Sequence, residues 1–464
     1  MQLPNTFKTP SFVQKLHWIA DPVNSMEKAA QKYPDLFTAF VVGFGDTTVF
    51  VQHPQALQEI LTNDRKRFAA LSEPNRFLRP SIGDNSVITL EGDRHKQRRQ
   101  ILMPPFHGER MQAYSHLISK LTEQIFSQLP QNSPFLAHTV TQQISLEVIL
   151  QVVLGLSEGE RYQKLKQPLI EITDMFQSSI VSAFMYFPFL QKDLGFLTPW
   201  GNFLRLRQQI DELLYAEIAE RREKPNAEGI DILSLLMSAK DKEGQSMTNQ
   251  ELRDEMMTLL LAGHETTATA IAWGLYWIHR QPEVRKKLIQ ELNTLGDFPE
   301  PMSIVRLPYL TAVCNETLRI YPIGMITFPR IVQEHTELLG HQLEPGTIVI
   351  GCIYLLHQRE DLYPNHKQFK PERFLERQFS PYEFMPFGGG VRRCIGDALA
   401  PFEMKLALAT IMSRYQLELI DNRPEQPQRR GTTLAPKNGV KMRLCGDVGK
   451  KVSDSQKNFT ASTF

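Results

Sequence analysis

One uninterrupted stretch of about thirty residues constrains the fold of this chain more than any other segment. Thr248 and Glu251 have the spacing of a capping box, and no proline follows before Pro282. At ~1.5 Å per residue, a helix of that length spans about 45 Å, which is the width of a whole domain. Both of its halves are apolar over most of their circumference, which predicts a helix buried through the middle of the molecule.

The centre of this predicted helix is polar, unlike its two ends. Residues 262–267 read A-G-H-E-T-T, and Gly263 alone costs about 1 kcal/mol relative to alanine in a helix. A glycine, an acid and two threonines contradict the local helix propensity and the burial of their neighbours. Because such conflicts often mark functional positions, we expect part of a site here.

Helical and strand-like segments divide the rest of the chain unequally. Between about residues 109 and 240, apolar residues recur at intervals of three and four, which predicts several helices. Residues 37–52 combine β-branched and aromatic runs with two glycines and an aspartate, a pattern typical of a hairpin. A second strand-like run covers residues 347–356, and the proline-rich stretch 357–386 predicts irregular structure. We therefore expect a mainly α fold with a smaller β region.

A single domain over residues 1–445 is the expected organisation. Its β-rich part is predicted at about 35–65 and 325–355, and the polar residues 446–464 predict a disordered tail. Residues 179–190 are strongly apolar and aromatic but too short to span a bilayer. They indicate core, or alternatively the wall of a channel for an apolar small molecule.

Charge balance and cysteine usage exclude several classes of protein. The chain carries 52 basic and 51 acidic residues, so it lacks the basic excess of a nucleic-acid binder. Its four cysteines form no C-x-x-C pair, so we expect neither a structural zinc site nor a disulfide framework. The N-terminal segment has neither a signal peptide nor the ~20-residue apolar span of a membrane anchor. We expect a monomeric, cytoplasmic protein, with loose membrane association as the alternative.

A glycine-rich loop around one cysteine is the strongest chemical signal. Residues 387–396 read F-G-G-G-V-R-R-C-I-G, and a helical pattern starts just after Cys394. Three successive glycines let the backbone approach a planar ligand closely. A helix N-terminus and the neighbouring Arg392 and Arg393 would favour the thiolate, the form that binds iron. Without the surrounding pattern, a reactive or merely buried cysteine in a glycine-rich turn would be the simpler interpretation.

The surrounding pattern resembles the cytochrome P450 family. The loop matches the haem-ligand signature F-x-x-G-x-R-x-C-x-G, whose fixed positions here are Phe387, Gly390, Arg392, Cys394 and Gly396. Further elements of that family follow in the expected order: H-x-x-x-R at 95–99, A-G-H-E-T-T at 262–267, E-x-x-R at 316–319 and P-E-R-F at 371–374. The resemblance covers about residues 33–444. It implies a triangular helical prism in which haem lies between a long central distal helix and the cysteine loop.

The resemblance also implies how this chain would hold its cofactor, haem b with an axial cysteine thiolate. His95, Arg99, Arg330 and Arg392 would serve the two propionates, which need cationic or hydrogen-bonding partners when buried. Ala262 and Gly263 would lie over the haem on its distal side, with Gly263 leaving room for dioxygen, and Phe387 and Gly396 would flank the Cys394 ligand. The other basic residues of the run 94–99, namely Arg94, Lys96 and Arg98, read as an ordinary solvated helix face.

Glu316 and Arg319 lie three residues apart, hence on one face of a helix. They could form a surface ion pair. The resemblance implies instead a buried structural network with Arg373 that supports the cysteine loop.

Glu265 and Thr266 would be the acid and alcohol of the distal helix. A threonine hydroxyl with ordered water, fed by an acid, can deliver the protons that dioxygen cleavage requires. The alternative is a threonine bonded back to its own helix and an exposed glutamate.

The function implied by the resemblance is a monooxygenase that hydroxylates an apolar small molecule with dioxygen and two electrons. The electrons would come from a separate ferredoxin or flavodoxin with an NAD(P)H-dependent reductase, and Lys405 with the arginines beside Cys394 are candidates for its docking surface. Alternatives are a haem-thiolate isomerase or dehydratase, a peroxide-driven enzyme and, remotely, a haem-based sensor.

The substrate pocket expected from the family topology is almost entirely apolar, which favours a fatty acid, alkane or terpene. Arg76 or Arg79 could anchor a carboxylate, although a loop arginine is more often only solvated. The expected lining residues are Phe77, Val87, Phe176, Phe184, Leu260, Leu261, Ile323, Met325, Ile326, Thr433 and Leu434.

Overall fold

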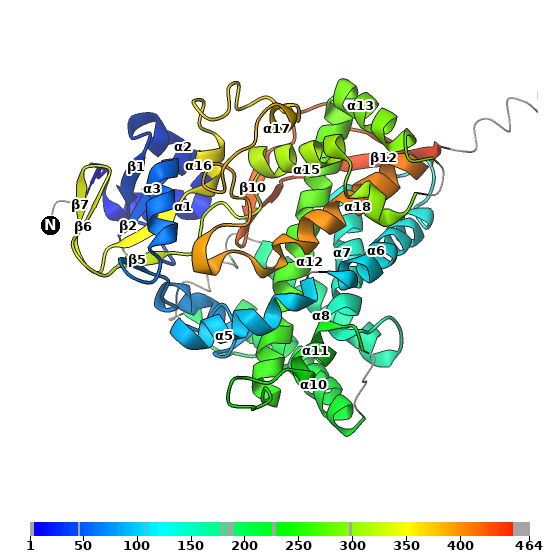
Figure 1. Ribbon diagram of the computed structural model, residues 1–464, viewed down its shortest axis with the longest axis horizontal. Helices are drawn as coiled ribbons and strands as arrows, with labels where there is room; N and C mark the ends of the chain where they lie inside the picture. Colours follow the sequence, from blue (N-terminus) through cyan, green and yellow to red (C-terminus); the bar gives the residue numbers. More distant parts are fainter. Residues whose placement is uncertain are drawn as a thin grey trace, which may run out of the picture.

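A strand-rich region and a larger helical region make up the molecule, as the sequence predicts. The computed structural model describes residues 4–44, 47–106, 108–177, 181, 187, 190–224, 229–296 and 299–448. Figure 1 shows the strand-rich region at the left and the helices at the right, with helix α12 running through the middle of the helical part. The mainly α architecture with a smaller β region is therefore confirmed.

Helix α12 (Asn249–Arg280) is the predicted central helix. Its capping box is formed: the Glu251 N–H donates to Thr248 Oγ1 at 3.2 Å, and the Thr248 N–H donates to Glu251 Oε2 at 2.9 Å. Most of its side chains are buried, and it packs against α7 (Ala137–Leu154), α10 (Pro199–Glu223) and α18 (Leu399–Arg414). Residues from both halves of the chain thus form one core around this helix.

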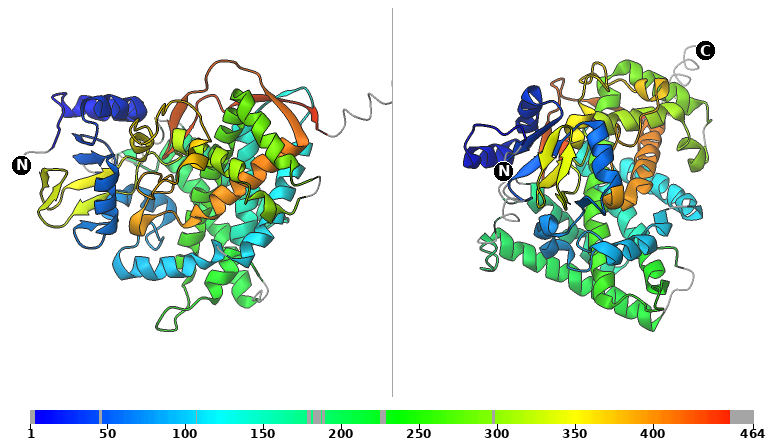
Figure 2. Two further views of the ribbon diagram at one scale, coloured as in Figure 1. Left: turned by 45° about the horizontal axis from the view of Figure 1, so that its top comes forward. Right: turned by 60° about the vertical axis from the view of Figure 1, so that its left-hand side comes forward.

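The other helices surround this core or cover the sheet. Figure 2 shows α1 and α2, in dark blue, lying beside the strands, where Trp18 and Met26 pack with Phe37 and Phe50. The remaining α-helices are α1 (Ser11–Ala20), α2 (Pro22–Lys32), α3 (Pro54–Thr62), α4 (Arg79–Ile82), α5 (Gly92–Leu102), α6 (Glu109–Ser127), α8 (Glu160–Gln177), α11 (Ile232–Ser238), α13 (Pro282–Asn293), α14 (Pro301–Ile304), α15 (Pro308–Ile320), α16 (Ile353–His357) and α17 (Arg373–Glu376). Short 3₁₀ turns cover Glu73–Leu78, Pro104–Phe106, Gly390–Arg392 and Ile395–Asp397.

The largest sheet has the strand order β1-β2-β8-β5-β3 and contains the predicted hairpin. Strands β1 and β2 pair antiparallel, and β2 pairs parallel with β8. Smaller sheets have the orders β4-β12-β9, β10-β11 and β6-β7. The strands are β1 (Leu36–Ala39), β2 (Thr48–Val51), β3 (Phe68–Ala69), β4 (Pro134–Leu136), β5 (Arg330–Val332), β6 (Thr336–Leu338), β7 (His341–Leu343), β8 (Ile348–Gly351), β9 (Tyr415–Leu419), β10 (Pro427–Arg430), β11 (Thr433–Pro436) and β12 (Lys441–Asp447).

The β-rich part differs from its predicted limits. Residues 54–62 form helix α3 rather than strand, because Pro54 starts a helix whose apolar residues lie on one face. Strands β3 and β4 and four strands between residues 415 and 447 lie outside those limits. Strand β12, which pairs with the distant β4, reaches Asp447, so residues 446 and 447 of the predicted tail 446–464 are strand, and residues 449–464 lie outside the described part of the chain.

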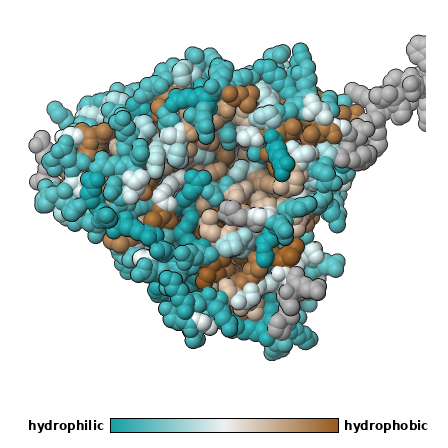
Figure 3. Space-filling model, viewed as in Figure 1, coloured by the Kyte–Doolittle hydropathy of each residue, from teal (hydrophilic) through white to brown (hydrophobic). Residues whose placement is uncertain are grey.

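Hydrophilic residues cover most of the face shown in Figure 3, interrupted by smaller hydrophobic patches. In the described ranges, no helix is both long and apolar enough to cross a membrane.

Candidate functional site

The cysteine loop turns sharply just before α18. Gly388 and Gly390 have φ angles of 67° and 64°, a backbone conformation that residues other than glycine rarely adopt. At Gly390 an added Cβ would lie 2.0 Å from Asp64 Oδ2, so only glycine fits there. The Cys394 N–H donates to the Phe387 carbonyl at 3.0 Å, which closes the loop. A 3₁₀ turn follows Cys394, and the regular helix starts only at Leu399, later than the sequence pattern predicts.

The pKa of the Cys394 thiol lies above its ordinary value, contrary to the sequence-based prediction. Desolvation of the thiolate by the surrounding protein is the main cause, although the residue remains exposed, and Asp397 adds to it. The Gly396 N–H, Arg99 and Arg393 act in the opposite direction but do not outweigh desolvation. Arg393 thus lowers the pKa as the sequence predicts, but the prediction left desolvation out. Coordination to a metal ion removes a thiol proton outright, so this environment is compatible with a thiolate ligand.

Asp64 anchors the cysteine loop, although no sequence motif indicates this role. Its Oδ2 accepts a hydrogen bond from the Val391 N–H at 2.7 Å and from Arg330 Nη2 at 3.0 Å. The side chains of Asp64 and Arg330 are each 2% exposed. Asp64 lies just after α3 in no recognisable motif, so only its spatial position identifies it.

Arg392 binds the backbone rather than another side chain. Its Nη atoms donate to the carbonyls of Val87 at 3.0 Å, Leu90 at 2.7 Å and Ala70 at 2.8 Å. The Nε atom of this buried guanidinium has no hydrogen-bond partner in the described structure, and the same holds for Arg330 Nε. A buried donor of this kind requires an acceptor, so the Nε atom of each arginine can donate a hydrogen bond to a bound anion.

His95 lies buried in the same cluster of cations. Desolvation lowers its pKa to about 3, and Arg392, Arg99, Arg65 and Arg330 contribute in the same direction. The imidazole is therefore neutral, and it can donate a hydrogen bond but not a positive charge. Several buried guanidinium groups without an equal number of acids form a suitable site for a dianion. The donor set fits the two propionates of a haem.

One face of α12 is accessible at its centre, and the accessible space beside Ala262 and Thr266 is called the hollow below. Throughout this fully described helix, Ala262 is the only exposed residue between Glu251 and His279. Thr266, one turn further on, is half-buried, and its hydroxyl donates to the Ala262 carbonyl at 2.7 Å. These two residues mark the part of α12 that a ligand can reach.

Gly263 has a different role from the predicted one. An added Cβ there would lie 2.5 Å from Ile149 Cδ1 on α7. The glycine thus allows α7 and α12 to pack closely, and the space that it leaves is filled by Ile149 instead of being open to dioxygen.

Glu265 points toward α7 and away from Thr266. Its Oε2 accepts from Gln142 Nε2 at 2.7 Å, and its Oε1 lies 3.2 Å from His138 Nε2. His138 Nε2 also lies 3.2 Å from Thr269 Oγ1. Burial alone would raise the pKa of Glu265, but His138 and, to a smaller extent, Gln142 lower it below its ordinary value. Glu265 is thus buried, which differs from the exposed glutamate of the alternative interpretation. Thr266 does bond back to its own helix, as that alternative expects.

The predicted network of Glu316, Arg319 and Arg373 is present and fully enclosed. Glu316 Oε2 accepts from Arg319 Nε at 2.7 Å, and Arg373 Nε lies 3.1 Å from the same carboxylate. Arg319 Nη1 donates to the His357 carbonyl at 2.9 Å, and His357 Nε2 accepts the Met385 N–H at 3.0 Å. Through His357, which no motif indicated, the network reaches the segment that enters the cysteine loop.

The predicted pocket residues divide into two groups. Leu261, Ile326 and Phe77 are half-buried, as expected of side chains beside the hollow. Leu260 and Leu434 are 0% exposed and pack inside the hydrophobic cores. Val87, Ile323 and Met325 pack there too, with at most 8% of their surface exposed. Thr433 is buried too, and its hydroxyl donates to the Arg430 carbonyl. The side chain of Phe176 and the whole of Phe184 lie outside the described residues.

Several basic residues lie differently from their predicted positions. Arg98, predicted to be solvated, is buried and pairs with two glutamates of α12. Lys405 donates to the Val305 carbonyl at 3.0 Å and is half-buried, so it is not a free docking residue. Arg76 pairs with Glu73 at the surface, in line with the solvated alternative, and Arg79 lies 3.6 Å from Asp84. The error for Arg98 arises because its partners on α12 are invisible in the sequence pattern.

Comparisons with known proteins agree with this geometry. The model of the cytochrome P450 family matches residues 4–443. Cytochrome P450 135B1 of Mycobacterium tuberculosis is 32% identical, over 96% of this chain and 92% of that protein. Cytochrome P450 137 of the same organism is also 32% identical, over 92% of this chain and 86% of that protein.

Two solved structures show the same fold. The retinoic acid-bound cyanobacterial CYP120A1 superposes with a TM-score of 0.83 at 23% identity, over 96% of this chain and 99% of that one. The haem domain of cytochrome P450DA gives a TM-score of 0.83 at 22% identity, over 96% and 97% of the two chains.

Proposed function

This chain belongs to the cytochrome P450 family of haem-thiolate monooxygenases, and on that basis we propose that it hydroxylates an apolar small molecule with electrons from a separate ferredoxin or flavodoxin. The observation that carries the proposal is the exposed face at Ala262 and Thr266 in an otherwise buried helix. Leu261, next to Ala262 in the helix, is an apolar side chain that is only half-buried there. A fatty acid, alkane or terpene would bury its surface against such a side chain favourably.

Cys394 would supply the thiolate ligand, and the cation cluster would hold the propionates through Arg392 Nε, Arg330 Nε, Arg99 and neutral His95. The bound haem supplies the activation of dioxygen. The glycines of the cysteine loop let the backbone approach the macrocycle, and Asp64 fixes the loop from behind.

Thr266 would hold and transfer protons at the wall of the hollow. Its Oγ1 can exchange the bond to the Ala262 carbonyl for one to an ordered water, because it lies on the reachable face of α12. Glu265 lies on the adjacent face, where His138 and Gln142 hold its carboxylate ionised and in one orientation, so it would pass protons on toward that water and not store one.

Thr266→Ala should keep the haem but uncouple electron use from hydroxylation. Without the hydroxyl, proton delivery fails, so product per NAD(P)H should fall by roughly tenfold or more while hydrogen peroxide rises. The measurement is the ratio of product and peroxide to NAD(P)H consumed with a surrogate ferredoxin and its reductase. Thr266→Ser keeps the hydroxyl and should restore most of the coupling. Equal coupling in the wild type and the alanine variant would contradict the relay role.

A panel of apolar compounds tests the substrate class. We expect laurate, palmitate, limonene or retinoic acid to displace water from the ferric haem and shift it from low to high spin, and the same compound to be hydroxylated when the surrogate electron donors are added. Product formed without any reductant would contradict the monooxygenase reaction. A spin shift with polar metabolites only would contradict the apolar substrate.

A further inference from the structure

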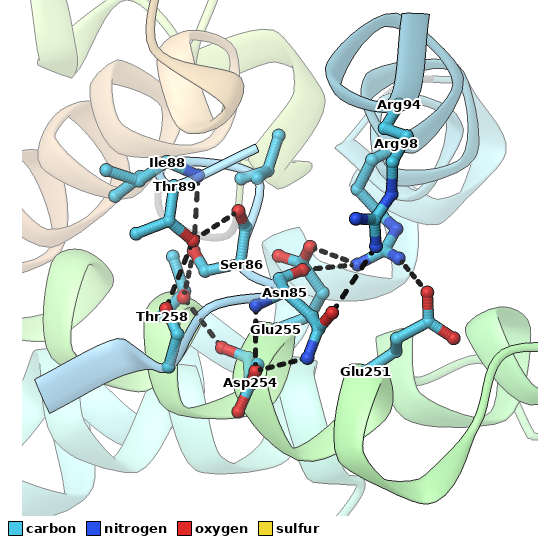
Figure 4. A network of polar contacts seen from close by, with 12 residues as sticks. Asn85, Ser86, Ile88, Thr89, Arg94, Arg98, Glu251, Asp254, Glu255 and Thr258 are labelled. Carbon is cyan, nitrogen blue, oxygen red and sulfur yellow. Dashed lines mark hydrogen bonds and ion pairs between the residues drawn. The ribbon is translucent and has the colours of Figure 1, made fainter. Parts of the chain in front are cut away.

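Residues 83–90 form a backbone segment that lies against the N-terminal half of α12 (Figure 4). Asp254 of α12 accepts two hydrogen bonds from Asn85 at its Oδ2, from the backbone N–H at 2.9 Å and from Nδ2 at 3.1 Å. Gly83, with a φ angle of 84°, leaves the space for this carboxylate, since an added Cβ would lie 2.2 Å from Asp254 Oδ1. The segment therefore makes its closest contact with α12 at Asp254.

The next residue of the segment is held from the same face of α12, because Ser86 Oγ accepts from Thr258 Oγ1 at 2.7 Å. Glu255 reaches the segment through Arg98, which donates both to Glu255 Oε1 and to the Asn85 carbonyl. Asp254 and Thr258 thus bind two consecutive residues of the segment, and Glu255 holds the arginine that binds the first of them. All three side chains are buried, so these contacts are not exchanged freely for water.

Arg98 of α5 closes the other side of this arrangement. Its Nη1 donates to the Asn85 carbonyl and to Glu255 Oε1, both at 2.7 Å, and its Nη2 donates to Glu251 Oε1 at 2.7 Å (Figure 4). One guanidinium therefore binds the segment and α12 together.

The charge of Asp254 is balanced by its neighbour on α12, since Arg253 Nη1 pairs with Asp254 at 2.9 Å. Helix α10 supports this pair, because Arg253 Nε pairs with Asp211 of α10 at 2.6 Å. Arg207 of α10 also donates from Nη1 to the Pro80 carbonyl at 2.8 Å, just before the segment. The segment is thus held by α12 and α5, and α10 binds the residue that leads into it.

The opposite edge of the segment faces the cysteine loop. The carbonyls of Val87, Ile88 and Leu90 accept hydrogen bonds from Arg392 at 3.0, 3.4 and 2.7 Å. Arg392 precedes Cys394 by two residues. The N–H group and the side chain of Asn85 therefore bind α12, while the carbonyls of residues 87, 88 and 90 bind the cysteine loop.

We propose that Asp254, Glu255 and Arg98 are positioning residues that fix residues 83–90 between the distal helix and the cysteine loop. Their first effect is on the guanidinium of Arg392, whose Nη atoms are held by the segment so that Nε faces the cation cluster. Their second effect, which rests on the proposed function, is to keep the backbone between α12 and the cysteine loop in one position and so to limit access to the haem.

The chemistry of the network favours positioning over simple stabilisation. Apolar side chains of similar volume would pack in this region without the desolvation cost of buried ions. Charged groups with directional hydrogen bonds specify one arrangement of a backbone that forms no regular element of its own between Gly83 and Leu90.

Asp254→Asn in the haem-loaded protein tests the proposal, because an amide cannot serve Asn85 and Arg253 together as the carboxylate does: if its carbonyl oxygen accepts from Asn85, its NH2 group faces the Arg253 Nη1 donor. We expect amide hydrogen exchange in residues 83–90 to become at least tenfold faster. Imidazole, used as a small probe, should associate with the ferric haem several-fold faster in a stopped-flow experiment. The haem content and the red-shifted Soret band of the reduced carbon monoxide complex should remain, because Cys394 is untouched.

Asp84→Asn is the matched control, since Asp84 lies in the same segment with its side chain 75% exposed and outside the network. It should change neither readout. If Asp254→Asn does not fold, Arg98→Lys, which keeps the charge but loses the multiple hydrogen bonds, should give the same two changes in smaller degree. Exchange that stays unchanged in residues 83–90, or rises evenly over the whole chain, would overturn the proposal. Neither readout requires a substrate, so a wrong substrate class would leave both results intact.

Discussion

Replacing Cys394 with serine should abolish the strongly red-shifted Soret band of the reduced, carbon monoxide-bound protein. A hydroxyl keeps the size of the side chain and the backbone hydrogen bond to the Phe387 carbonyl, so the loop should keep its shape. A neutral serine hydroxyl donates far less electron density to iron than a thiolate does. The measurement is the difference spectrum of the purified, dithionite-reduced variant with and without carbon monoxide. Hydroxylation of every compound in the panel should be lost with the band.

Cys445 provides the matched control for this experiment. Like Cys394 it is an exposed residue, it lies on β12, and its thiol lies 3.9 Å from the Arg443 carbonyl. Cys445→Ser should leave the spectrum unchanged. A red-shifted band that survives in Cys394→Ser and disappears in Cys445→Ser would show that the ligand assignment is wrong.

Glu316→Ala should prevent the protein from retaining haem. The substitution leaves the guanidinium groups of Arg319 and Arg373 buried without their carboxylate. Breaking a buried ion pair from one side costs about 3 to 5 kcal/mol, which is a large fraction of the ~5 to 15 kcal/mol that keeps a domain folded. The effect reaches the cysteine loop through His357 and the Met385 N–H. The measurements are haem per polypeptide and the thermal unfolding midpoint.

Two further variants separate this effect from a general loss of charge. Glu283, on the exposed side of α13, is a glutamate of the same size, and Glu283→Ala should change neither haem content nor unfolding. Glu316→Gln keeps the shape and part of the hydrogen bonding, so it should fall between the wild type and the alanine variant. Full haem content in Glu316→Ala would contradict the supporting role of the network.

The features predicted correctly from the sequence all have local physical causes. Helix α12 follows from a capping box and from a long stretch without proline. The pairing of Glu316 with Arg319 follows from a spacing of three residues on a helix, which brings side chains together wherever the helix lies. The turn at Gly388 and Gly390 follows from the backbone freedom of glycine. In each case the neighbours along the chain supply the explanation.

The errors concern residues whose partners are far away in sequence. Arg98 has the sequence context of a solvated helix, yet its side chain is buried and pairs with Glu255 of α12. Gly263 lies at the predicted place on the distal helix, but Ile149 of α7 occupies the space beside it. Asp64 has no motif, and it anchors the cysteine loop only because α3 ends next to Val391 and Arg330.

The sequence by itself determined the family, the cysteine that serves as the candidate iron ligand, the central helix and the buried acid network. These depend on residue types at fixed spacings, which the chain carries wherever it folds. Only the tertiary structure decided which way each polar side chain on α12 points, which arginine atoms remain available to an anion, and how residues 83–90 connect α12 to the cysteine loop. Burial and long-range hydrogen bonds set these properties, because the desolvation of a polar group and the partner that compensates it depend on neighbours that chain folding brings together.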